Sequence, residues 1–113
     1  MPKAVRRLDP LLEADRAATT AMITAEVISS ARSRPEFDVL RAHFAALTCL
    51  PEPDALWDRV AESRFALARQ GWQARLIDRA VAVTAAASGH RLLTRDRDFA
   101  PIARVLALDL DLF

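Results

Sequence analysis

Glycine and cysteine are scarce in this chain of 113 residues, and each scarcity excludes a class of site. The two glycines, Gly71 and Gly89, lie far apart, which excludes a GxGxxG dinucleotide turn and a Walker-type phosphate loop, because both need several glycines in one loop. The single cysteine, Cys49, excludes a disulfide framework and a cysteine-based zinc site.

Charge of one sign and long apolar runs are also lacking. The 16 basic residues are nearly cancelled by 15 acidic ones, so no overall field drives non-specific binding to nucleic acid. No run approaches the ~18 apolar residues of a membrane span, and no signal peptide is recognisable at the start. We therefore expect a cytoplasmic protein without a membrane partner. The length predicts a single domain over residues 1–113.

The order of apolar patterns predicts an α/β fold in which a short parallel sheet is flanked by helices on both faces. This prediction rests on short apolar segments, typical of buried strands, that alternate with segments in which apolar residues recur every three or four positions, as in helices. We expect strands over residues 17–22, 48–50, 90–93 and 105–108. We expect helices over residues 4–14 (restarting at Pro10 after an Asp9 cap), 23–32 (ended by Pro35), 37–47, 54–70, 76–88 and 98–104.

Four carboxylates follow or flank the expected strands, where parallel α/β sheets place their ligands. Glu26 follows the first strand, Asp78 opens the helix before the third strand, and Asp96 and Asp98 directly follow that strand. Carboxylates that converge at one end of a sheet repel each other unless a cation neutralises them. Oxygen ligands of this kind suit Mg²⁺ or Mn²⁺, which polarise phosphodiesters and activate water.

Each of these residues also has a structural interpretation. Asp78 and Asp98 are in positions to cap the helices that begin beside them, and Glu26 is in a position to complement a helix dipole. Residues 95–98, with alternating charges, fit a solvated turn. The two tryptophans, Trp57 and Trp72, are better explained as core or interface anchors than as base-stacking platforms.

Three segments in their order resemble the PIN-domain family, specifically the VapC-type ribonuclease toxins of bacterial toxin–antitoxin pairs. They are TTAMITAEV at residues 19–27, IDRAVA at residues 77–82 and LLTRDRDF at residues 92–99, and the resemblance runs from residue 8 to residue 110. It implies a PIN-like three-layer sandwich. It also implies an acidic site, with catalytic Glu26, Asp78 and Asp96, metal ligands at these positions and at Asp98, and a supporting hydroxyl on Thr94.

The resemblance further implies Mg²⁺- or Mn²⁺-dependent hydrolysis of RNA, an antitoxin of the VapB type as partner, and a homodimer. The family begins with a strand that ends in Asp-Thr-Ser or similar and supplies one acidic ligand. Residues 1–8 do not match it, so we expect this N-terminal strand to be missing and the domain to be truncated relative to the family. Two hypotheses follow: a ribonuclease toxin whose true start lies upstream, or a catalytically impaired remnant that acts only in dimerisation or antitoxin binding.

Overall fold

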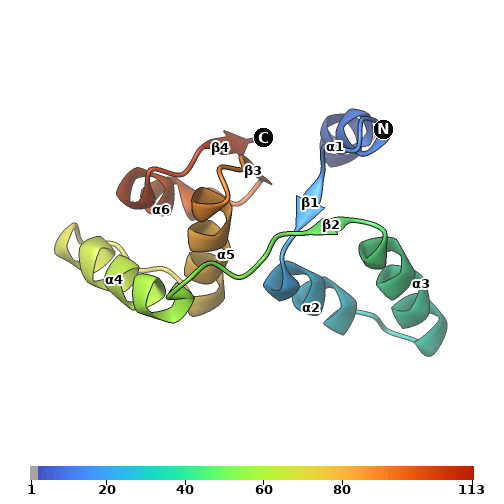
Figure 1. Ribbon diagram of the computed structural model, residues 1–113, viewed down its shortest axis with the longest axis horizontal. Helices are drawn as coiled ribbons and strands as arrows, with labels where there is room; N and C mark the ends of the chain where they lie inside the picture. The colour runs from blue at the N-terminus through green and yellow to red at the C-terminus, as the bar shows by residue number, and fades with distance from the viewer. Residues whose placement is uncertain (1–2) are drawn as a thin grey trace. The chain divides into compact units, whose positions relative to one another are not determined.

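The computed structural model describes residues 3–113, and side chains from residue 6 onward. The chain forms two compact units, Met1–Leu50 and Pro51–Phe113 (Figure 1). Each unit contains one two-stranded parallel sheet and the helices connected to it. The expected α/β class and the parallel pairing of its strands are therefore confirmed.

In the first unit, β1 (Ala18–Thr19) pairs with β2 (Thr48–Cys49). Helix α1 (Lys3–Glu13) precedes β1, and the connection from β1 to β2 consists of α2 (Ala21–Ser29) and α3 (Arg34–Ala45), which pack against each other (Figure 1). Both connecting helices begin at a hydroxyl cap. The Thr20 side chain accepts a bond of 3.1 Å from the backbone N–H of Ile23, and Ser33 accepts one of 3.2 Å from Glu36.

The second unit begins with two helices, α4 (Leu56–Arg69) and α5 (Leu76–Ala87). Strand β3 (Leu92–Thr94), helix α6 (Phe99–Leu106) and strand β4 (Leu110–Leu112) follow. The two strands pair in parallel from Leu92 with Leu110 to Thr94 with Leu112. Helix α5, drawn in orange, lies beside both α4 and α6 (Figure 1).

The core of the second unit is built around α5, which is buried without interruption from Arg79 to Ala85. Most of the buried positions are small, and Ala80 and Ala82 are fully inaccessible. Small side chains allow neighbouring helices to approach closely, and the larger Leu67 of α4 and Ile102 of α6 fill the space between them. Residues of both neighbours thus meet on a stretch of α5, residues 79–85, that is buried throughout.

One charged side chain, Arg79, is buried within this core with only 6% of its surface exposed. Its Nη1 donates to the Val60 carbonyl at 2.7 Å, and its Nε donates to the Ala74 carbonyl at 3.2 Å. These bonds connect the first turn of α5 to α4 and to the segment between the two helices. Burial, and to a smaller extent the neighbouring Arg64 charge, lowers the pKa of Arg79. Buried charges need such partners because desolvation is costly.

The expected strand over residues 105–108 is wrong. Val105 and Leu106 form the last turn of α6, which ends where Ala107 adopts a left-handed backbone with φ of 53°. The N–H of Leu108 then donates to the Ala103 carbonyl at 3.0 Å, which closes the helix end and buries Leu108 in the core. Periodicity does not separate a short apolar run in a strand from one at a helix end, and the true strand lies two residues further on.

The two prolines expected to interrupt or end helices act differently. Helix α1 passes through Pro10, so the expected restart after Asp9 is wrong, since a proline in a helix removes one bond and need not end it. Pro35 lies in the first turn of α3, where its missing N–H costs nothing, and so it opens a helix instead of stopping one. Among residues 3–113, no helix is long and apolar enough to cross a membrane.

Replacement of Ile102 by alanine tests the position of the core. Ile102 of α6 is fully buried in the core cluster that it forms with residues of α4 and α5. Ile102→Ala should therefore lower the free energy of unfolding, measured in urea titrations, by about 2–5 kcal/mol. The control Leu76→Ala removes a comparable side chain that is 53% exposed, and it should cost about 1 kcal/mol or less. Equal losses for the two variants would contradict the core described here.

Candidate functional site

Asp78 is fixed in the first turn of α5 by the burial of the residues that follow it. Its side chain is 13% exposed, and its Oδ2 accepts a bond of 3.3 Å from Nε of Arg75, which is 82% exposed. The interpretation of Asp78 as the N-cap is wrong, because Arg75 occupies that position and Asp78 is the third residue of the helix. The carboxylate is thus held at a helix N-terminus beside one solvated cation, where the helix dipole favours negative charge.

Asp96 is held in a compact turn that begins where β3 ends. The Thr94 hydroxyl accepts a bond of 3.0 Å from the backbone N–H of Asp96. The Asp96 Oδ1 in turn accepts one of 2.9 Å from the backbone N–H of Asp98. These two bonds fix the backbone and one carboxylate oxygen of Asp96, which leaves its Oδ2 available for another partner. The Thr94 side chain therefore contacts the backbone of Asp96, and its supporting role in the site stays a prediction.

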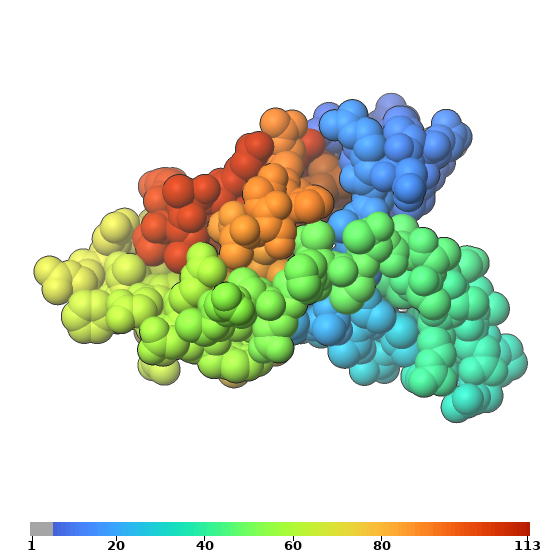
Figure 2. Space-filling view, in the orientation of Figure 1, coloured from blue at the N-terminus to red at the C-terminus, as the bar shows by residue number. Residues whose placement is uncertain are grey.

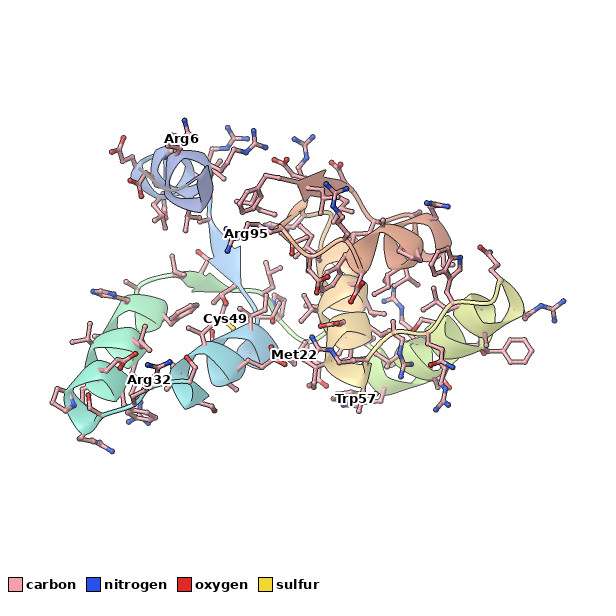
Figure 3. All side chains as sticks on the ribbon, turned by 180° about the vertical axis from the view of Figure 1, so that it is seen from behind. Arg6, Met22, Arg32, Cys49, Trp57 and Arg95 are labelled. Carbon is pink, nitrogen blue, oxygen red and sulfur yellow. The ribbon has the colours of Figure 1, made fainter. Side chains whose placement is uncertain are left out.

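Asp98 occupies the N-cap position of α6, but its side chain makes no capping hydrogen bond and is exposed. The carbonyl of Asp96 accepts the N–H of Phe99 at 3.2 Å, so Asp96 organises the start of this helix. The interpretation of Asp98 as a side-chain cap is therefore wrong. The charged segment 95–98 is a hydrogen-bonded turn, in which Asp96 is half-buried while Arg95, Arg97 and Asp98 are exposed (Arg95 is labelled in Figure 3).

Glu26 belongs to the first unit, where it lies in the second turn of α2 with its side chain exposed. The first turn of that helix contains no acidic residue, so the interpretation of Glu26 as a partner of the helix dipole is wrong. Among the described residues 3–113, no three His, Cys, Asp or Glu side chains are grouped so as to hold a metal ion.

The donor atoms of Asp78 and Asp96 nevertheless suit a hard divalent cation. Mg²⁺ is usually bound by one or two carboxylates together with waters and substrate phosphates, and it does not require a cage of protein ligands. Both aspartates carry a carboxylate oxygen that no hydrogen bond of the described residues occupies, Oδ1 in Asp78 and Oδ2 in Asp96. These residues therefore fit such an ion by the chemistry of their donors.

Two features of the structure were missed by sequence reasoning. The first is the buried Arg79, which gave no signal because arginines are frequent throughout the chain. The second is a largely apolar groove of about 440 Å³ in the first unit, bordered by Thr24, Arg41, Phe44 and Cys49 among others. Cys49 lies beside α2 there (Figure 3). None of the four candidate carboxylates lines this groove.

Comparison with known protein families shows which family this chain belongs to. The sequence profile of the PIN domain matches residues 2–105. The chain belongs to the PIN-domain family. This confirms the resemblance drawn from residues 19–27, 77–82 and 92–99, and with it the fold class. No curated protein matches the sequence.

Two solved structures are similar to this PIN domain. One is VapBC-5 from Mycobacterium tuberculosis, a member of the VapBC family of toxin–antitoxin systems, with 27% identity over 88% of this chain and 83% of that chain and a TM-score of 0.72. The other is FitAcB from Neisseria gonorrhoeae, with 18% identity over 97% of this chain and 85% of that chain and a TM-score of 0.67. The second likeness shows the fold alone.

The Thr94 hydroxyl should hold the turn that carries Asp96. Thr94→Val keeps the shape of the side chain but removes the acceptor of the Asp96 N–H, so exchange of that amide, measured by NMR, should accelerate roughly 3–10-fold. Thr94→Ser keeps the hydroxyl and should leave the exchange rate near that of the wild type. Unchanged exchange in the valine variant would show that the hydroxyl does not hold this turn.

Proposed function

We propose that this PIN domain is a metal-dependent endoribonuclease and the toxin of a toxin–antitoxin pair. The match of the PIN-domain profile over residues 2–105 is the observation that carries this proposal. The similarity to VapBC-5, at 27% identity over most of both chains, supports the assignment to a toxin–antitoxin pair. The substrate is RNA, whose phosphodiester is the bond cleaved.

The proposed catalytic carboxylates are Glu26, Asp78 and Asp96, with Asp98 as a further metal ligand. A bound Mg²⁺ or Mn²⁺ would polarise the phosphodiester and lower the pKa of a coordinated water. The chain's own residues supply the positioning. The first turn of α5 holds Asp78, and the Thr94 hydroxyl holds the backbone of Asp96 at the end of β3.

Two exposed arginines flank Asp96 and support an anionic substrate. Arg95 and Arg97 are both exposed on the turn that carries it. An arginine guanidinium binds phosphate oxygens through two parallel hydrogen bonds, and it remains charged at any pH at which the enzyme works. We propose that this pair binds phosphates of the RNA backbone next to the carboxylates.

Loss of one carboxylate charge tests the catalytic assignment. Asp96→Asn keeps the acceptor for the Asp98 N–H but removes the negative charge, so Mn²⁺ affinity and Mn²⁺-dependent cleavage of RNA should fall by at least about 10–100-fold. The measurements are a calorimetric Mn²⁺ titration and a cleavage assay with and without a chelator.

The matched control is Glu52→Gln, which removes an exposed carboxylate from the segment before α4. It should bind Mn²⁺ and cleave RNA as the wild type does. A wild-type protein that cleaves no RNA with either metal would support the alternative, an impaired remnant that acts only by binding. Equal activity of the wild type and Asp96→Asn would exclude Asp96 from the site.

An antitoxin of the VapB type is the proposed protein partner. Such a small protein would block the nuclease most directly by presenting an arginine to the carboxylates, because arginine–carboxylate pairs are strong and directional. Asp96→Asn should then weaken the complex by roughly tenfold in a calorimetric titration, while Glu52→Gln leaves it unchanged. Purification of the native protein from its own cells without any small partner would contradict this assignment. We also propose that the toxin itself forms a homodimer.

A further inference from the structure

The ion pair at the start of α5 joins two side chains in different surroundings. The Asp78 side chain is largely covered, whereas its partner Arg75 is 82% exposed. The pair of Arg91 with Asp109 instead joins two exposed side chains. An ion pair with a solvated partner stabilises a fold little, because water screens the charges. Stability therefore does not account for the cation beside this candidate ligand.

The backbone that carries Arg75 is held by the buried Arg79. The Arg79 Nε donates to the Ala74 carbonyl at 3.2 Å, and the Arg79 backbone N–H donates to the Arg75 carbonyl at 3.1 Å. The Arg79 side chain is itself anchored in the core through the Val60 carbonyl. The bond from the Arg75 Nε to Asp78 then restrains the guanidinium. A side chain that is already in place when its ligand arrives loses less entropy on binding.

The guanidinium of Arg75 keeps most of its donors after it has bonded Asp78. That bond uses Nε alone, and no hydrogen bond within the described part of the chain occupies Nη1 or Nη2. The N–H groups of these two nitrogens suit the oxygens of a phosphate, which arginine binds through two parallel hydrogen bonds. Since all three nitrogens belong to one planar group, an anion bound there lies next to the Asp78 carboxylate.

The segment before Asp78 carries positive charge without a compensating acid. Three arginines and no acidic residue stand between Glu62 and Asp78 in the sequence. They are Arg64, Arg69 and Arg75, and all three are exposed. Figure 2 shows the end of α4 and the turn after it, in yellow, at the surface of the second unit. This local excess of positive charge, in a chain of formal charge +1, favours an anionic ligand.

We propose that Arg75 is a substrate-binding residue, which holds a phosphate of the RNA backbone beside the Asp78 carboxylate. Its Nε fixes Oδ2 of Asp78 and leaves Oδ1 to a divalent cation, while its Nη groups bind the phosphate. This inference rests on the proposed function, because it takes RNA as the substrate. It adds a contact at the start of α5 to those proposed for Arg95 and Arg97 on the turn after β3.

Binding of RNA without metal tests this assignment independently of cleavage. The probe is a fluorescently labelled single-stranded RNA, titrated in EDTA at several salt concentrations and followed by anisotropy. Loss of one phosphate contact lowers the slope of log K against log salt by about 0.7 for a single strand. Arg75→Gln should show this smaller slope and bind RNA about 5–10-fold more weakly at roughly 50 mM salt. Arg75→Lys keeps the charge and should keep the wild-type slope.

The matched control is Arg91→Gln, which also removes an exposed arginine paired with an aspartate. Arg91 precedes β3, whereas the candidate Asp96 follows that strand, so this variant should bind RNA as the wild type does. If the wild type cleaves RNA and Arg75→Gln binds RNA with unchanged affinity and slope, the inference about Arg75 is overturned and the proposed function stands. A wild type that neither binds nor cleaves RNA would overturn both.

A calorimetric Mn²⁺ titration separates the phosphate contact from an effect through Asp78. Arg75→Gln removes a cation beside the carboxylate, so it should bind Mn²⁺ at least as tightly as the wild type, because like charges repel. Weaker Mn²⁺ binding together with unchanged RNA binding would show that Arg75 only positions Asp78, and it would overturn the phosphate contact.

Discussion

Burial of α5 is the constraint on which the second unit depends. Seven consecutive residues, Arg79 to Ala85, are inaccessible, so this helix has no solvent face over nearly two turns. Six of these residues are alanine, valine or threonine, and such small side chains let α4 and α6 pack closely against the helix. The burial also restrains the candidate residue Asp78, which immediately precedes the buried stretch. The bonds from Arg79 to the Val60 and Ala74 carbonyls hold the same turn in place.

The sequence was a good guide to the helices and a weaker one to the strands. Helical periodicity located α4 and α5 to within about two residues, because an apolar face repeated over three turns is a long signal. The strands are only two or three residues long, too short for alternation to show. The apolar residues 105–108 were therefore mistaken for a strand, while the true β4 contains Asp111, whose charge hid it.

The sequence pointed to the candidate carboxylates but not to the hydrogen bonds around them. Asp96 was singled out because it directly follows β3, where parallel sheets place their ligands, and Asp78 because it opens the otherwise apolar helix before that strand. The hydrogen bonds that link Thr94, Asp96 and Asp98 could not be predicted, because a turn of this kind depends on backbone angles that several residue types adopt. Asp78 and Asp98 were both expected to cap helices through their side chains, and neither does so. The sequence also left open whether Trp57 is buried or exposed, because a tryptophan is expected both in a core and at an interface; the structure shows it 52% exposed.

The central claim is that carboxylates of this PIN domain bind a divalent cation for RNA cleavage. A crystal of the protein grown with Mn²⁺, measured near the manganese absorption edge, tests this most directly, because anomalous scattering locates the ion independently of any assay. The account predicts an anomalous peak within coordinating distance of the Asp78 and Asp96 carboxylates, about 2.0–2.3 Å. A well-ordered crystal with both carboxylates free of metal at saturating Mn²⁺ would contradict it.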